Sequence, residues 1–471
     1  MKHYIITTLF LFQFLNGTGQ NSNTTYNLQE CIAIALKNNL DLKSARLQTK
    51  TADVYFKQSK NALLPTLNGN YSIGKTSGRS IDPFTNNFIN QGLTFSNAGL
   101  NLDVSIFNGF RIKNEIKQSR FNMQASEMEI EEVKQNLVLK VTLLYIQILN
   151  TKDLLKLTKA RLISTKSQLK RLESNYDTGV GNPADFTDMQ GQHTTDQAEI
   201  ITAENNLKSA IINLVKVLNL DIDAKIEFEN IFGLVDTEKY PFSANEIYND
   251  ALENLATFKS KQLKIDAAKT GVKVAKSSYF PEVSLFGLLN TNYSNNAQVF
   301  NKTGTSIIET GDFVNINNQE YAVLRNEDLF EGSKIDYMDQ FNNNLNSAAG
   351  ISIRIPLFNG FRIKNNVKIE KLQLEETQVN LQQTKFTFKQ SIKEAYNNME
   401  ASFNRYHILL KQVEAFEESF RINEVRFNNG VSNVVDYIIS KNNMDASRLN
   451  LNKTKYEYLL RVKILDYYRG I

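Results

Sequence analysis

Cysteine, proline and histidine are scarce in this chain of 471 residues, which has 1, 6 and 3 of them, respectively. The single cysteine, Cys31, excludes a disulfide within one chain. His193 and His407 have no nearby companions at metal-ligand spacing, and the chain has no phosphate-binding loop, Gly-x-Ser-x-Gly motif or dinucleotide fingerprint. We therefore expect no catalytic residues, no cofactor and no metal site. The low proline content is compatible with very long helices.

Charge of one sign is also lacking, because 54 Lys and Arg residues are interleaved with 50 Asp and Glu residues. A net charge of +4 in this pattern gives no basis for binding nucleic acid. After residue 20 no apolar run is long enough to span a bilayer as a helix. Any insertion into a membrane must then use β-strands, whose backbone polar groups pair with one another.

The N-terminus has the composition of a secretory signal peptide, which we assign to residues 1–19. A basic start precedes an apolar run of 12 residues, Tyr4 to Leu15, and Gly17 and Gly19 precede the expected cleavage point. The run is too short for a membrane anchor, which needs about 20 residues. Cys31 lies eleven residues past the cleavage point, too late to carry a lipid, and its apolar helical surroundings predict a buried position.

The sequence contains an internal repeat. Phe107–Asn114 recurs unchanged as Phe358–Asn365, 251 residues later. Earlier segments align at an offset of 216, so that Pro65 corresponds to Pro281. The offsets differ by 35 residues, all of which lie between Pro281 and Phe358. A tandem duplication with one enlarged loop explains this pattern, and such a repeat should govern the fold.

A long helix is expected after the repeated motif in each copy. Apolar and small side chains recur at alternate steps of four and three residues, from Leu137 to Leu172 and again from Phe388 to Asn423. This period of 3.5 residues makes helices coil around a neighbour. The segment from Phe110 to Ser174 has 65 residues and would be about 98 Å long as a helix. A tube that crosses the periplasm or a cytoskeletal coiled coil needs such a rod, whereas a globular domain does not.

Four segments alternate apolar and polar residues with the period of a β-strand. They predict strands at about 65–75 and 97–107 in the first copy and at about 281–294 and 348–358 in the second. The pattern suits a membrane barrel with lipid outside and water inside, and an ordinary half-exposed sheet alternates in the same way. Four strands cannot close a barrel, so we expect oligomers, and three subunits would supply twelve strands.

Aromatic residues stand where a strand meets a long helix, as in the interfacial girdle of a membrane barrel. These residues are Phe107, Phe110, Phe358 and Phe361. Polar segments at about 75–92 and 295–346 connect the strands, and we expect both to be loops outside the cell.

This order of elements resembles the TolC family of outer-membrane factors over essentially the whole mature chain. The resemblance is carried by Leu28–Asn39 (LQECIAIALKNN), Leu64–Thr66, the two Phe-Asn-Gly-Phe strand exits, and the turns Tyr176–Gly179 and Phe427–Gly430. It implies an α+β membrane protein in the outer membrane of a Gram-negative bacterium, extending into the periplasm. In such a homotrimer, a 12-stranded β-barrel with four strands per subunit is continued by a long α-helical coiled-coil barrel.

The resemblance also implies the activity and the partners. Members of the family conduct substrate passively in a tripartite efflux or type I secretion system. A periplasmic adaptor joins them to an inner-membrane transporter of the RND or ABC type, and outer-membrane lipid surrounds the barrel. Drug efflux, metal export and protein secretion use similar ducts, so the cargo and the transporter class stay open.

The duplication predicts a first repeat at 20–221, an equatorial linker at 222–243 and a second repeat at 244–471. The helices expected in the two repeats lie, in chain order, at about 110–175, 183–218, 361–427 and 433–460. The residues after Leu459 should join the linker in an equatorial collar, which the resemblance implies.

One tight turn should connect the two helices of each pair, which gives two such turns in the chain. The glycines in these turns can adopt the positive φ that a reversal of the chain needs. The residues expected there are Gly179, Val180, Gly181 and Asn182 in the first turn and Gly430, Val431, Ser432 and Asn433 in the second. The resemblance implies that these turns dock the adaptor.

The same resemblance places the pore aperture near these turns. In a trimer, Asp185 and Asp436 would each form a ring of three carboxylates that favours cations, or each could simply supply helix-capping charge. At the positions where the family has a locking arginine and a tyrosine, this chain has Ser432 and Phe427. We therefore do not expect the family's ionic and tyrosine-mediated lock. We expect an apolar constriction at Phe427, with Tyr176 also at the aperture, and Phe427→Ala should then raise single-channel conductance.

Two other interpretations can be weighed against a channel. A periplasmic coiled-coil scaffold without channel activity accounts for the heptads but not for the alternating strands. A stand-alone diffusion porin would need many more strands and few long helices.

Overall fold

The computed structural model describes residues 24–81, 86–90, 92–221, 226–229 and 238–471, and it divides into two compact units. The sheet unit comprises Ala52–Met123 and Leu263–Gln378. The helical unit comprises Gln124–Gln262, Val379–Ile471 and the described residues before Ala52. The predicted signal peptide lies outside the described residues, as does most of the predicted linker.

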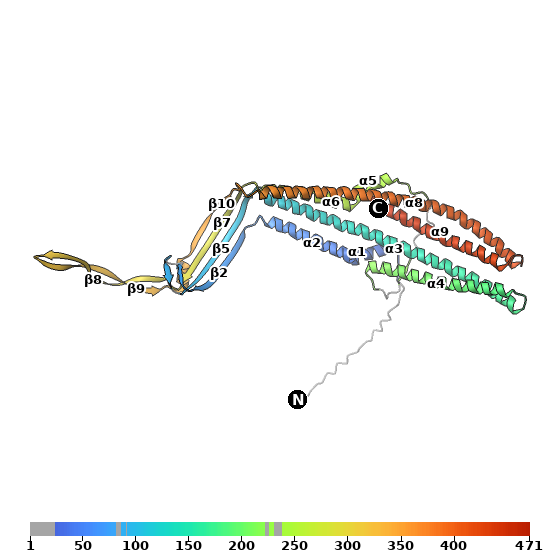
Figure 1. The fold of residues 1–471 in the computed structure, drawn as a ribbon, viewed down its shortest axis with the longest axis horizontal. Helices are drawn as coiled ribbons and strands as arrows, with labels where there is room; N and C mark the ends of the chain where they lie inside the picture. The colour runs from blue at the N-terminus through green and yellow to red at the C-terminus, as the bar shows by residue number, and fades with distance from the viewer. Residues whose placement is uncertain (1–23, 82–85, 91, 222–225, 230–237) are drawn as a thin grey trace, which may run out of the picture. The chain divides into compact units, whose positions relative to one another are not determined.

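A four-stranded antiparallel sheet forms the centre of the sheet unit, with the order β10-β7-β5-β2 (Figure 1). Its strands are β2 (Thr66–Thr76), β5 (Leu93–Asn108), β7 (Glu282–Ser294) and β10 (Asn346–Arg354). The fourth strand was expected to reach Phe358, but β10 ends at Arg354. Pro356 has no backbone N–H to donate to a ladder, which explains the earlier end.

One face of this sheet is apolar and the other is mainly polar. Leu102 on β5 lies opposite Leu67 on β2, and its neighbour Asn101 lies opposite Asn68. Phe286 of β7 is an apolar exception on the polar face, where it lies opposite Asp103. Its ring covers Gly350 of β10, where an added Cβ would lie 2.7 Å from the ring. The aromatic ring therefore fills the space that the glycine leaves.

The segment between β7 and β10 is structured and is not the polar loop expected at 295–346. It contains the hairpin β8 (Gln298–Ile316) and β9 (Gln319–Lys334), followed by the short helix α7 (Tyr337–Asn343) (Figure 1). Asn317 and Asn318 form the hairpin turn with φ of 51° and 66°. A type I′ turn needs positive φ at both central residues, and asparagine tolerates it. The other predicted loop also contains a small pair, β3 (Arg79–Ile81) and β4 (Phe88–Asn90).

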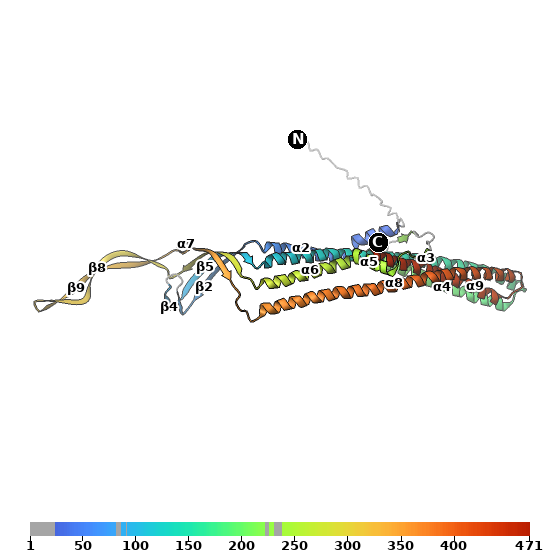
Figure 2. The ribbon, with the colours of Figure 1, turned by 90° about the horizontal axis from the view of Figure 1, so that it is seen from above.

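Two long helices, α3 (Arg111–Asp177) and α8 (Arg362–Asn428), have 67 residues each. Each leads into a second helix, α4 (Pro183–Leu218) after α3 and α9 (Val434–Arg469) after α8. Figures 1 and 2 show α4 beside the later part of α3, and α9 beside the later part of α8. None of the helices in the described residues is both long and apolar enough to span a membrane.

The last helix is longer than expected, because it was predicted to end near residue 460 and α9 continues to Arg469. Leu459 and Leu465 are both buried, so the apolar helical pattern extends through this stretch. Gly470, at φ 80°, then ends the helix in the left-handed conformation common after a last turn.

The duplication is visible in the helix pairs that precede the strands. These are α1 (Leu28–Asn38) with α2 (Leu40–Asn61), and α5 (Ala244–Asn254) with α6 (Ala256–Ser277). Asn27 and Glu30 form a capping box at the start of α1, and Ser243 and Glu246 form the same box at the start of α5.

A core cluster in the helical unit joins α1, α3, α4 and α9 around Cys31 and Tyr145. Cys31 is fully buried, as the sequence predicted, and burial raises the pKa of its thiol to about 12. The Tyr145 hydroxyl donates a hydrogen bond of 2.6 Å to the Glu229 carbonyl oxygen. Glu229 follows β6 (Ile226–Phe228), which pairs in parallel with β1 (Thr24–Tyr26). The hydroxyl therefore ties this small sheet to the middle of α3.

Candidate functional site

The turn between α3 and α4 closes with backbone hydrogen bonds to the end of α3. The Val180 N–H donates to the Asn175 carbonyl at 3.1 Å, and the Gly179 N–H donates to the Tyr176 carbonyl at 3.0 Å. Gly179 has φ 74°, and an added Cβ at Gly181 would lie 2.8 Å from the Tyr176 nitrogen. Both glycines are therefore required by the backbone, one for its conformation and the other for space.

The turn between α8 and α9 repeats this geometry 251 residues later. The Val431 N–H donates to the Arg426 carbonyl at 2.9 Å, and the Gly430 N–H donates to the Phe427 carbonyl at 3.1 Å. Gly430 has φ 71°. Both turns are Schellman motifs, in which the residue after the glycine often packs back onto the helix. Here Val180 and Val431 are instead 85% and 67% exposed, so each turn presents an apolar side chain at its apex.

The helices that follow the turns begin with asparagine caps. Asn182 Oδ1 accepts from the Ala184 N–H at 3.1 Å, and Asn433 Oδ1 accepts from the Asp436 N–H at 2.8 Å. Asp185 lies in the first turn of α4, where its Oδ1 accepts from the Asn182 side chain at 3.2 Å. Asp436 lies in the first turn of α9 and is exposed. Both carboxylates therefore occupy the position of helix-capping charge, and their predicted pore role stays a prediction.

Phe427 is buried at the end of α8, and its predicted part in an apolar constriction stays a prediction. Only 8% of the residue is exposed, and its ring stacks on Tyr437 with centroids 4.9 Å apart. The guanidinium of Arg171 lies over the ring, 4.9 Å from its centroid. The other buried members of this cluster are Leu172, Met189 and Val434. Within one chain, the ring therefore packs between the helices that meet at this tip.

Tyr176, at the matching place in the first copy, packs differently from Phe427. Its ring stacks on Phe186 at 5.4 Å with 12° between the planes, and the residue remains exposed. Ser432, the other predicted residue of the second turn, is half-buried. The two tips thus share backbone geometry but differ in the aromatic packing behind it.

The predicted interfacial aromatics form two matching pairs in the sheet unit. Phe107 and Phe110 contact edge to face at 5.5 Å and 85°, and Phe358 and Phe361 do so at 5.5 Å and 87°. Phe110 and Phe361 also adopt φ of 65° and 61°, which is rare for a bulky residue. This strained backbone turns the chain from strand to helix in both copies, and the repeated motif was its only sign in the sequence.

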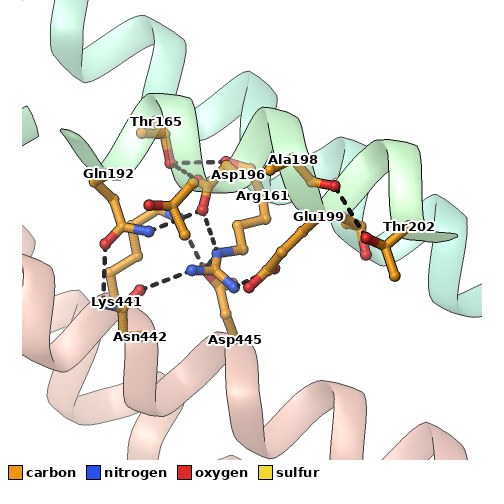
Figure 3. A network of polar contacts seen from close by, with 12 residues as sticks. Arg161, Thr165, Gln192, Asp196, Ala198, Glu199, Thr202, Lys441, Asn442 and Asp445 are labelled. Carbon is orange, nitrogen blue, oxygen red and sulfur yellow. Dashed lines mark hydrogen bonds and ion pairs between the residues drawn. The ribbon is translucent and has the colours of Figure 1, made fainter. Parts of the chain in front are cut away.

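A buried network of charges in the helical unit was not apparent from the sequence. Figure 3 shows Arg161 of α3 between Asp196 of α4 and Asp445 of α9. Arg161 Nε lies 2.9 Å from Asp196 Oδ1 and 3.5 Å from Asp445 Oδ2. Lys441 Nζ lies 2.7 Å from the same Asp445 oxygen and is almost fully buried.

Two uncharged side chains of the network donate hydrogen bonds to the carboxylate of Asp196, which is fully buried. Its carboxylate accepts from the Thr165 hydroxyl at 2.5 Å and from the Gln192 amide at 2.8 Å. The positions 251 residues after Arg161 and Asp196 are Gln412 and Ser447, neither of which is charged, so the network is not duplicated. Removing one partner from a buried pair costs about 3–5 kcal/mol, so loss of one of these charges should weaken the packing of α9 on α3 and α4.

Within the described residues, no group of three or more His, Cys, Asp or Glu side chains could hold a metal ion. The structure instead combines a sheet that is apolar on one face with two long helical hairpins that end in matching turns. This combination belongs to the class of outer-membrane channels that are built from both strands and long helices.

The family model of outer membrane efflux proteins matches residues 31–220 and 247–467. The chain therefore belongs to the outer membrane efflux protein family, which is the family that the sequence resembled. It is 21% identical to outer membrane protein TolC of Vibrio cholerae, over 95% of this chain and 91% of that protein. It is also 22% identical to toxin and drug export protein A of Aggregatibacter actinomycetemcomitans, over 92% of this chain and 83% of that protein.

Solved structures agree with this assignment at the level of the fold. A crystal structure of CusC superposes with a TM-score of 0.75 at 17% identity and covers 94% of this chain and 92% of that one. The CmeC channel of Campylobacter jejuni superposes with a TM-score of 0.74 at 19% identity and covers 94% and 85%. The predicted α+β fold with its tandem repeat is confirmed, as are the location in the outer membrane and the function as an efflux channel. The family is one of passive channels and not a class of enzymes.

Proposed function

We propose that three copies of this chain form the outer-membrane exit duct of a tripartite efflux or type I secretion system. The observation that carries the proposal is the four-stranded sheet, in which β2 and β10 are the two edges. Unpaired edges recruit further strands, and four strands are too few to enclose water. Pairing of β10 with β2 of the next copy closes twelve strands into one barrel.

The composition of the two faces of the sheet indicates which face would point outward in the closed barrel. The face with Leu67, Leu102 and Leu285 would contact lipid, and the face with Asn68 and Asn101 would line a water-filled lumen. The helical hairpins of the two repeats, 20–221 and 244–471, would form a periplasmic tunnel, with the linker at 222–243 in its collar. The channel supplies no energy, so an inner-membrane transporter of the RND or ABC type drives the cargo.

The exposed valines at the helix turns support docking of a periplasmic adaptor at these tips. Val180 and Val431 stand at the apex of matching turns, and neither packs back onto its own helix as this motif often does. An adaptor with a complementary apolar end would bury both. Near the same tips, Asp185 and Asp436 would form two rings of three carboxylates in the trimer.

Insertion into planar bilayers tests the channel. The purified protein should produce discrete single-channel current steps, and a complete lack of steps would contradict the proposal. Leu102→Arg places a charge on the apolar face, which costs about 2–4 kcal/mol at the middle of a membrane. Asn101→Arg is its matched control on the polar face. Leu102→Arg should lose most insertion events and Asn101→Arg should keep them, whereas equal effects would refute the assignment of the faces.

Photo-crosslinking tests the docking turns. A photoreactive phenylalanine analogue at Val180 or Val431 in the native host should crosslink to a periplasmic adaptor, which mass spectrometry would identify. Ile163, which is exposed on α3 and lies 16 residues before Gly179, is the control position outside the turns. Adaptor crosslinks at Ile163 but not at either valine would exclude docking by the turns.

A further inference from the structure

The short helix α7 packs on the apolar face of the sheet, at the end opposite to the Phe-Asn-Gly-Phe motifs. We propose that α7 is an interfacial helix that lies among the lipid headgroups of the outer leaflet and fixes the height of the barrel in the membrane. This inference rests on the proposed barrel. The helix lies in a segment of the second repeat whose polar sequence suggested a loop.

Hydrogen bonds between side chains place α7 on the apolar face. The hydroxyl of Tyr337 lies 3.0 Å from the Ser96 hydroxyl and 3.1 Å from the Tyr71 hydroxyl. Tyr71 alternates in phase with Leu67 on β2, and Ser96 alternates in phase with Leu100 on β5. The helix therefore covers the face that would contact lipid, and the lumen face stays free of it.

An aromatic cluster surrounds this contact. The Tyr337 ring lies 4.8 Å from the Tyr293 ring and 4.5 Å from the Phe341 ring, measured between centroids. Together with Tyr71, the cluster contains three tyrosines, each with an apolar ring and a polar hydroxyl. Side chains of this kind concentrate at the boundary between hydrocarbon and water, where they form the girdles of membrane barrels.

Polar bonds to the end of β7 hold the helix in one position. Buried Gln340 accepts from the Ser294 N–H at 2.9 Å and donates to the Ser294 carbonyl at 3.0 Å. Thr291 donates to the Phe341 carbonyl at 2.7 Å, and Asn344 donates to the Asn292 carbonyl at 2.9 Å. The helix is thus attached to the sheet by side chains and backbone together, so it cannot swing away from the wall as a free loop would.

The outward side of α7 mixes apolar and polar groups. Met338 is 64% exposed, and the neighbouring Asp339 and Asn342 are also exposed. A carboxylate and an amide would be costly in hydrocarbon, and an exposed methionine gains nothing from water. The headgroup layer accommodates both kinds of group, which makes it the environment that fits this surface.

Two aromatic sets lie at opposite ends of the sheet: the cluster around Tyr337 at one end and the phenylalanines of the Phe-Asn-Gly-Phe motifs at the other. The distance between them matches the thickness of the apolar band of a membrane barrel. Phe107 follows Ser96 by eleven residues on β5, which at about 3.4 Å per residue is about 37 Å along the strand. A strand tilt of about 40° reduces this length to about 28 Å along the membrane normal. The apolar band of such barrels is about 25 Å tall. The two aromatic sets therefore lie one band apart, with Leu100 and Leu102 between them.

A single-tryptophan experiment tests the proposal, because the chain has no tryptophan of its own. The probes are phosphatidylcholine vesicles that contain lipids brominated either near the carbonyl end or near the middle of the acyl chain. In reconstituted protein, Met338→Trp should lose more fluorescence to the lipid brominated near the carbonyl end. Leu102→Trp, at mid-band, should lose more to the lipid brominated at mid-chain. Ile316→Trp, at the exposed end of the β8–β9 hairpin, should be quenched by neither.

The outcomes separate this inference from the proposed function. If Leu102→Trp is quenched and Met338→Trp is not, α7 lies in water and the inference fails while the barrel stands. Quenching of Met338→Trp mainly by the mid-chain lipid would place α7 in hydrocarbon and would also overturn the inference. If Leu102→Trp is not quenched, the sheet is not embedded, and the proposed barrel fails together with the inference.

Discussion

Phe427→Ala should loosen the tip of the α8–α9 hairpin, because the ring fills the cluster that holds this tip together. The ring stacks on Tyr437 and lies under the guanidinium of Arg171. Truncation of a buried phenylalanine to alanine costs about 3–5 kcal/mol. Since every 1.4 kcal/mol is a factor of ten, local opening of the tip should become at least about 100 times more frequent.

Hydrogen–deuterium exchange measured by mass spectrometry detects this opening. Amides around Gly430 should exchange at least about 100 times faster in Phe427→Ala than in the unmodified protein. Phe427→Leu keeps most of the apolar volume and should cost less than about 1.5 kcal/mol. Val431→Ala changes an exposed side chain and serves as the control with little effect. Amides in the middle of α3, near Tyr145, should be unaffected in all three variants.

If Phe427→Ala leaves exchange at the tip unchanged and instead raises single-channel conductance, the ring lines the aperture. The burial of Phe427 within one chain would then not represent the assembled protein, and the constriction that the sequence suggested would be confirmed.

Three further predictions concern buried and charged groups. Cys31, whose pKa burial raises to about 12, should react with a maleimide at neutral pH only after denaturation, and labelling of the native protein would contradict its burial. Asp196→Asn should lower the free energy of unfolding by about 3 kcal/mol, measured by chemical denaturation with circular dichroism as the signal. The control Glu204→Gln breaks an exposed pair with Lys159 and should cost less than about 1 kcal/mol. Equal losses in the two variants would contradict a stabilising role of the buried network. Asp185→Asn combined with Asp436→Asn should reduce cation preference in reversal-potential measurements, and an unchanged preference would leave both residues as helix caps only.

Features that depend on local pattern could be predicted from the sequence. The 3.5-residue period and the repeated Phe-Asn-Gly-Phe motif indicated two long helices, and the structure has them as α3 and α8. The turn glycines, Gly179 and Gly430, were recognisable because a tight reversal between helices needs positive φ. Each of these signals is contained in a few consecutive residues or in one regular period.

Features that depend on distant residues could not be predicted from the sequence. The cluster of Phe427 with Met189 and Tyr437 joins three helices, and the place of Phe427 beside a turn gave no sign of these neighbours. The network of Arg161, Asp196 and Asp445 joins three helices, and in sequence each residue resembles an ordinary charge on a solvated face. The β8–β9 hairpin was taken for a loop because polar residues hide its alternation, although two consecutive asparagines at its turn were a local clue.

If three chains contribute four strands each to one barrel, the detergent-purified protein is a trimer. Native mass spectrometry, with the micelle removed in the gas phase, should then detect a single species with the mass of three mature chains. A species with the mass of one chain, under conditions that keep the protein folded, would mean that separate copies do not form a common barrel.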